Sequence, residues 1–395
     1  MKPWLRLLPF ALLLFILPFP GTVALRLLAL FCGLVVCLVV WRREGFPPVP
    51  AGVALLLWAT CALLSLTTAV DPAYSLGEIK NEVGYAMAAY LGFLTLGRAT
   101  EDARFFALAL VVGNLAITAL ALSDHYLMVR GTWKEGGLAG GSGVYSTYLV
   151  TIVPALLWAG FVLDRKYRLP LALIVLQAAM AVATTQRMFW LAFAVQLLFA
   201  MYLLRIRGFI ALSAARSRLV AAVVLGLAVL AMIGMTAKRY DGQGISYWMK
   251  DARFAVWRGV VTRIQEHPLA GKGFGRQTMK TAYPDLVSRE NTEVWHPHNV
   301  FLNYGIAMGI PGVIVLVLLF SALLRRFWRL SRSPNQTLAL AGISGVMLVT
   351  GVVVRNLSND FFQRDQALLF WAVAGLLLGY AQHAKRAPGV ESGRR

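Results

Sequence analysis

The chain has 395 residues, of which 58% are hydrophobic and only 14% are charged, and its mean hydropathy is +0.66. These values exclude an ordinary soluble enzyme, in which about a quarter of the residues are charged. The formal net charge of +20 would suit a nucleic-acid-binding protein. The apolar runs argue against that class, because membrane proteins also concentrate basic residues at the cytoplasmic ends of their helices. We therefore expect an all-α, polytopic integral membrane protein that contacts membrane lipids and has no nucleic-acid partner.

Apolar runs predict about twelve membrane-spanning helices, since one span needs about 20 apolar residues. The first run follows a basic start, as in a signal peptide, but no clear small-x-small cleavage site comes after it, and we interpret it as a span. The predicted spans are residues 5–20, 22–41, 50–70, 83–97, 104–123, 144–163, 169–185, 188–204, 219–236, 300–324, 336–354 and 366–383.

The spans divide the chain into four parts. Residues 1–236 carry the first nine helices, residues 237–299 form one large loop, residues 300–385 carry three helices, and residues 386–395 are a polar tail. Lys and Arg concentrate in the loops on the same side as both termini. The positive-inside rule then predicts cytoplasmic termini and a large loop in the opposite compartment.

The large loop is predicted to be partly helical. In WMKDARFAVWRGVVTRIQEH, apolar residues recur at helical spacing, and Pro268 and the glycines of GKGFG end the pattern. With Trp and Arg among its residues, this helix is expected to lie along the membrane surface.

Two of the five histidines stand in the motif WHPHN, where the large loop meets the tenth span. Pro297 biases His296 towards an extended conformation, so His296 and His298 are expected on a stiff entry to the span. An imidazole there could be a general base, a phosphate contact or a metal ligand, or could make ordinary interfacial hydrogen bonds.

No metal site and no cofactor are predicted. Cys32, Cys37 and Cys61 lie in apolar runs without a C-x-x-C pair, and Glu293 is the only carboxylate close to the histidines. The sequence also has no Walker loop, no G-x-S-x-G, no H-E-x-x-H and no D-x-D.

Basic residues form the second candidate group. Arg187, in TTQRMFW, falls at an outer turn between two spans, where the positive-inside rule disfavours a positive charge. An anionic headgroup or a diphosphate is its expected partner, and Arg253, Arg258 and Lys80 could join it in a phosphate-binding cluster. The alternative for each is snorkelling to the interface or a structural ion pair.

The stretch from Asp251 to Gly312 resembles the shared core of the O-antigen ligase, O-antigen polymerase and protein O-oligosaccharyltransferase superfamily. The resemblance rests on R-x-x-x-W (Arg253 and Trp257), on HPLAGKGFG and on HPHN before an apolar span. The ligase pattern of His, a polar residue, nine residues and G-x-x-G is met by His298, Asn299, Gly309 and Gly312. One departure is Val315, where the family often has Gly, Thr or Tyr.

This resemblance implies an inner-membrane enzyme with a fold like that of the C-type glycosyltransferases and with a site facing the periplasm. It would move a glycan from undecaprenyl diphosphate onto the lipid A-core oligosaccharide. Cations would stabilise the leaving diphosphate, and we assign this role to Arg187 and Arg253, with Lys80 and Arg258 as further contacts. Neutral His298 would take the proton of the acceptor hydroxyl, and in-line attack would invert the anomeric centre without a metal.

Four further residues have open roles beside this scheme. Asn299 could orient His298 or cap the tenth span, and Trp257 could stack on sugar rings or anchor the interface. The role of His296 stays open. Asp360 lies in the last external loop with Arg355 and Arg364, and it is expected to brace the site through an ion pair.

Two other functions fit parts of this pattern. O-antigen polymerase uses the same donor but extends a second lipid-linked glycan, so an assay with lipid A-core distinguishes it from a ligase. A transporter or flippase of a lipid-linked anion would also need cations in the membrane, but it would be expected to show repeated halves and broken helices.

Overall fold

The structure, a computed structural model, describes residues 3–97, 100–124, 139–164, 168–211, 213–239, 252–287, 295–360, 362 and 364–384. Every regular element within these ranges is a helix. In chain order they are α1 (Pro3–Ile16), α2 (Val23–Glu44), α3 (Gly52–Leu64), η1 (Ser65–Thr68), α4 (Pro72–Glu78), the π-helical η2 (Ile79–Gly84), α5 (Tyr85–Leu96), α6 (Thr100–Ser123), α7 (Ser142–Leu163), α8 (Arg168–Thr184), α9 (Arg187–Ile206), α10 (Ala214–Arg239), α12 (Ala252–Glu266), α13 (Thr278–Ala282), η4 (Pro284–Leu286), α14 (Val300–Ser331), α15 (Gln336–Arg355) and α16 (Arg364–Ala384).

A helix lies at each predicted span, which confirms an all-α membrane protein. By length and composition, seven helices among the described residues are able to cross a bilayer: α2, α6, α7, α9, α10, α14 and α15. The apolar helices at residues 4–16, 52–68 and 168–184 are shorter than 18 residues. Twelve crossings, and the direction of each, therefore remain a prediction.

The helices form one bundle around a continuous apolar core. Helix α7 lies at its centre, and 94% of its most apolar stretch of 18 residues is buried. Helix α10, by contrast, packs against α9 at the edge of the bundle, and only 6% of its most apolar stretch of 18 residues is buried. A helix that is apolar all round belongs either in a core or against lipid, and the two helices illustrate these two cases.

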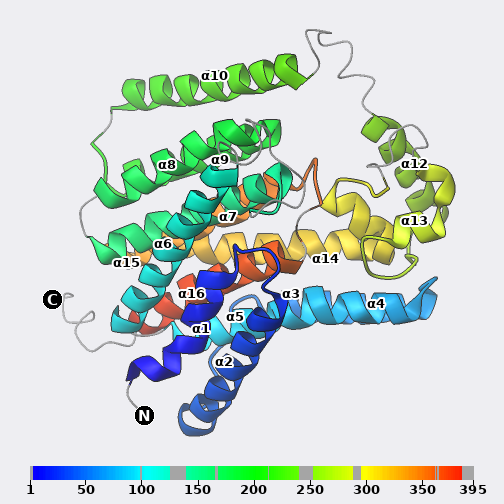
Figure 1. The fold of residues 1–395 in the computed structure, drawn as a ribbon, viewed down its shortest axis with the longest axis horizontal. Coiled ribbons are helices and arrows are strands. Elements are labelled where there is room, and N and C mark those ends of the chain that lie inside the picture. The colour runs from blue at the N-terminus through cyan, green and yellow to red at the C-terminus, as the bar shows by residue number, and fades with distance from the viewer. Residues whose placement is uncertain are drawn as a thin grey trace.

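The large loop packs on one end of the bundle. Helices α12 and α13 lie beside the beginning of α14, and α4 extends towards the same end (Figure 1). The beginning of α1 and the end of α16 lie at the opposite end (Figure 1). A small apolar cluster of Val256, Val260, Met279 and Ile306 joins α12 and α13 to α14. This cluster fixes the position of α12, which ends before Pro268 as the sequence predicts.

Helix α14 is kinked at Gly309, which has a φ of +71° and a ψ of −169°. A side chain at this position would be strained by the positive φ, so glycine suits it. Pro311 lacks an N–H and, in a regular helix, its ring would collide with the carbonyl of Ala307. The kink frees that carbonyl for a partner outside the helix.

The partner is the glycine loop, residues 271–275. The N–H groups of Lys272 and Gly273 donate to the carbonyls of Ile306 and Ala307, over 2.8 and 3.1 Å. The glycine loop also contacts the turn before α4, where the N–H of Val70 donates to the carbonyl of Lys272 over 3.0 Å. Predicted only as a turn, the loop is thus bonded between the α3–α4 connection and the kink of α14.

Candidate active site

The HPHN motif forms a tight turn into α14. Asn299 is the N-cap, because its Oδ1 accepts hydrogen bonds from the N–H groups of Phe301 and Leu302, over 2.9 and 3.2 Å. Its amide nitrogen donates to the carbonyl of Leu357 over 2.9 Å, which ties the turn to the loop between α15 and α16. His298 stands before the cap with a φ of +49°, a conformation disfavoured for a residue with a side chain. Asn299 therefore makes the contacts of a capping residue.

His296 lies beneath His298 and is 1% exposed. Its Nδ1 accepts a hydrogen bond from the backbone N–H of His298 over 3.1 Å, and its Nε2 contacts the Arg276 guanidinium. Because both ring nitrogens face N–H groups, the doubly protonated ring is disfavoured. Burial, followed by the charges of Arg276, His298 and Arg253, lowers the pKa of His296 far below its ordinary value. His296 is thus neutral and positions the backbone of His298.

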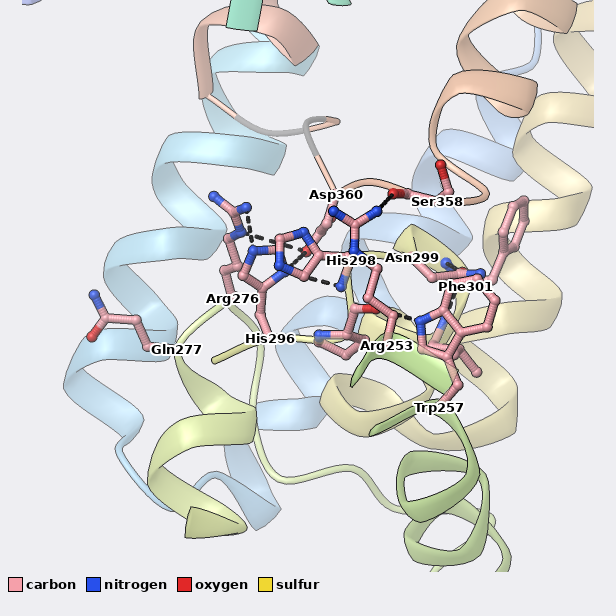
Figure 2. Close-up of polar contacts among 12 residues, drawn as sticks. Arg253, Trp257, Arg276, Gln277, His296, His298, Asn299, Phe301, Ser358 and Asp360 are labelled. Carbon is pink, nitrogen blue, oxygen red and sulfur yellow. Dashed lines mark hydrogen bonds and ion pairs between the residues drawn. The ribbon is translucent and has the colours of Figure 1, made fainter. Parts of the chain in front are cut away.

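Arg276 was not among the sequence-predicted site residues. It follows the glycine loop directly, and the geometry of that loop delivers its side chain to the histidines (Figure 2). Its guanidinium also stacks over the ring of Trp295, 5.0 Å from the ring centroid. The sequence shows Arg276 directly after the motif HPLAGKGFG, but no local pattern indicates that its side chain contacts His296.

Helix α12 contributes Arg253 and Trp257. Arg253 rises from the helix beside the histidines and donates to the carbonyl of Ser358 over 3.3 Å (Figure 2). The indole N–H of Trp257 donates to the carbonyl of Pro297 over 2.6 Å. One turn apart on the same face, the two residues join α12 to both loops of the site. Trp257 thus braces the HPHN turn.

Asp360 lies in the loop between α15 and α16, and its side chain is 4% exposed. Its Oδ2 is 3.9 Å from Nε of Arg276 and 4.0 Å from Nδ1 of His296. Burial raises the pKa of Asp360 to about 6, and the charge of Arg276 opposes that rise. Asp360 therefore forms an ion pair, as predicted, but its partner is Arg276 in the large loop.

Arg187 begins α9 after a turn in which Thr185 has a φ of +53°. Gln186 donates to Ser142 Oγ at the start of α7 over 3.1 Å, which holds this turn to α7. The start of α7 is bonded in turn to the end of α15 by the 2.8 Å hydrogen bond from Arg355 to Ser146. Arg187 therefore lies at the same end of the bundle as His298.

Lys80 and Arg258 are placed differently. Both side chains are exposed, Lys80 on the π-helical η2 and Arg258 on the outer side of α12. The charged side chains of this segment that face inward are Glu78 and Glu82, and Glu78 pairs with Arg364 over 3.1 Å. Residues four apart share one face of a helix and a residue two positions away lies on the opposite face, so Lys80 is exposed where Glu78 and Glu82 are buried.

No three His, Cys, Asp or Glu side chains gather as metal ligands in the part of the chain that the structure describes. What the site offers is a partly exposed imidazole on a rigid turn, two guanidinium groups and one buried carboxylate. Such a set can take a proton from a hydroxyl and can stabilise an anion nearby.

A family model described as O-antigen ligase matches residues 171–317. The match includes Arg187, Arg253, the glycine loop, both histidines of HPHN and the G-x-x-G of α14, and ends before Asp360. No curated protein was found to match the chain.

Proposed function

We propose that the protein is an O-antigen ligase, because a family model with that description matches residues 171–317. It transfers a glycan from undecaprenyl diphosphate to the lipid A-core oligosaccharide at the periplasmic face of the bacterial inner membrane. The observation that carries the proposal is the position of His298: it directly precedes the N-cap of a membrane helix, its backbone is held by His296, and it lies beside Arg253 (Figure 2).

His298 acts as the general base of the transfer. Its neutral imidazole takes the proton of an acceptor hydroxyl while the hydroxyl oxygen forms a bond to the anomeric carbon of the donor sugar. The bond between that carbon and the diphosphate oxygen breaks, and its electron pair leaves with the diphosphate. Attack opposite the leaving group inverts the anomeric configuration.

Asp360 supplies the charge that this step requires. Proton transfer turns His298 into a cation beside Arg253. A third positive group, the Arg276 guanidinium, lies near because it contacts the neighbouring His296. A buried carboxylate in the same cluster compensates for part of that charge, because electrostatic interactions are strong where water is excluded. Asp360 must be ionised to do so.

Arg187 and Arg253 stabilise the diphosphate. The negative charge on the leaving group grows as the glycosidic bond breaks, so fixed cations lower the barrier more than they strengthen ground-state binding. Replacing either arginine with alanine is expected to weaken donor binding and to reduce turnover about 10²–10³-fold. Lys280, an exposed cation on α13, provides the control, and Lys280→Ala should retain wild-type kinetics. Wild-type turnover in both arginine variants would show that the diphosphate is held elsewhere.

The rate of transfer is expected to fall as the pH decreases through about 6, where Asp360 takes up a proton. The Asp360→Asn variant should have a lower maximal rate and an acidic limb that lacks the contribution of Asp360 and keeps only that of the base, as measured by pH–rate profiles of both proteins. If the limb persists unchanged in the variant, another group is responsible for it.

Asp360→Asn should lower the rate of transfer but raise the stability of the protein at neutral pH. A raised carboxylate pKa means that the folded state favours the protonated form, so stability declines as the pH rises from about 4 through about 6. Asp360→Asn should therefore unfold at a higher temperature than the wild type at pH 7.5, and this difference should vanish at pH 4. A destabilised variant at pH 7.5 would mean that the ion pair with Arg276 outweighs the burial of the carboxylate.

Transfer in vitro tests the proposed function as a whole. Purified protein in detergent is given undecaprenyl-diphosphate-linked glycan and lipid A-core, with and without EDTA. Glycan attached to lipid A-core, equally with EDTA, is the expected result. Longer chains on the lipid carrier, with lipid A-core unused, would make the protein an O-antigen polymerase instead.

A further inference from the structure

A pocket of about 360 Å³ opens beside the two histidines. Its walls come from α4, the start of α7, the residues after the glycine loop, and the start of α16. Its volume lies within the range of about 300–1,000 Å³ that is common for small-molecule sites. Neither the base nor the proposed diphosphate cations Arg187 and Arg253 line it, so the catalytic scheme leaves the pocket unassigned.

The charges in the wall favour an uncharged ligand. Arg276 and Arg364 are balanced by the carboxylates of Glu78 and Asp365. Arg364 donates to Glu78 over 3.1 Å, and Asp365 forms an ion pair with Arg26. A diphosphate would need an excess of positive charge and would be repelled by two carboxylates. A ligand with many hydroxyl groups, by contrast, can use both donors and acceptors.

The remaining wall residues suit a sugar ring. Trp295 and Tyr74 supply aromatic surface, and Gln277 and Gln366 supply amides. Within the described part of the chain, the side-chain oxygen of Gln366 is buried without a hydrogen-bond partner. An unmet buried acceptor is unfavourable, so a rotation of the Gln366 side chain that brings this oxygen to a ligand hydroxyl in the pocket gains free energy.

Arg276 connects the pocket to the reacting centre. It lines the pocket, and the same guanidinium contacts Nε2 of His296, whose other ring nitrogen holds the backbone of His298. A ligand in the pocket is therefore connected to the His298 turn through Arg276 and His296. We infer that this pocket is a saccharide subsite, which holds one sugar unit of a glycan substrate next to the bond that is made. The inference rests on the proposed glycosyl transfer.

The sugar could belong to the donor repeat or to the acceptor core, and direct binding tells the two apart. Saturation-transfer NMR on the full-length protein in detergent is measured with the free repeat oligosaccharide, the free core oligosaccharide and inorganic pyrophosphate. We expect one of the oligosaccharides to bind, which identifies its source, and pyrophosphate not to displace it. Displacement by pyrophosphate, or no binding of either oligosaccharide, would overturn the saccharide subsite.

Two variants locate the binding. Gln366→Ala removes one hydrogen bond and should weaken sugar binding about 2–10-fold, as expected for about 0.5–1.5 kcal/mol. Val144→Trp fills the pocket from the first turn of α7 and should abolish binding. The matched control is Gln382→Ala, in the same helix as Gln366 but at its other end, where the side chain bonds to Pro48.

The three variants give clear outcomes. Unchanged binding in both Gln366→Ala and Val144→Trp would overturn the proposal, and if Val144→Trp does not fold, Gln366→Ala against Gln382→Ala still decides. A protein that binds sugar through this pocket but transfers no glycan would overturn the proposed function and leave the subsite in place.

Discussion

Replacing His298 with asparagine is expected to lower the rate of glycan transfer about 10²–10⁴-fold, which is the usual contribution of a positioned general base. Asparagine is chosen because it tolerates the positive φ of this position better than alanine does, so the turn before α14 should persist. His298→Ala should lose activity to the same degree. Donor binding and the unfolding temperature should stay close to those of the wild type in the asparagine variant.

The measurement is the initial rate of transfer at saturating donor and acceptor, with donor binding measured separately. His267→Ala is the matched control, because His267 lies in the same large loop but is exposed beyond the end of α12. It should transfer glycan at the wild-type rate. Near-normal turnover by His298→Asn would show that another group takes the proton.

Replacing Gly271 with alanine is expected to destabilise the protein and abolish transfer together. A Cβ at this position would lie 2.0 Å from the carbonyl oxygen of Ala307 and 2.2 Å from the backbone nitrogen of Met308. Backbone atoms cannot move aside as a flexible side chain can, so the glycine loop would have to leave α14 and lose its hydrogen bonds to Ile306 and Ala307. Arg276, which follows the loop, would then be displaced from His296.

Thermal unfolding in detergent and the transfer assay test this expectation. Gly226→Ala provides the control, because nothing lies within 4 Å of a Cβ there and alanine favours a helix. The control should be as active as the wild type and at least as stable. If Gly271→Ala also unfolds at the wild-type temperature and retains transfer, the contact between the glycine loop and the kink of α14 is not needed for the site.

Local sequence patterns determined the parts of the protein that depend on neighbouring residues. The apolar runs located the helices, because a run of about 20 apolar residues is buried in lipid or in the core as a helix. The helical spacing from Phe254 onwards and the break at Pro268 located α12. Asn299 before an apolar run is a typical N-cap, and the structure has it in that role. His296, His298 and Arg253 were also predicted as site residues, and the structure brings them together.

Tertiary structure alone decided which charged side chains join them. Arg276 reaches His296 only because Gly309 breaks α14 and the glycine loop bonds to the carbonyls exposed there, a contact between segments about 35 residues apart that no local period encodes. The packing of α4 and η2 likewise decides which face of this segment is buried: Glu78 and Glu82, four residues apart, face the bundle, and Lys80 between them is exposed. The helices, the cap and the candidate base could thus be predicted from the sequence, because they follow from local composition and spacing. The charges around that base were decided by the fold, because they come from loops whose positions depend on long-range backbone contacts.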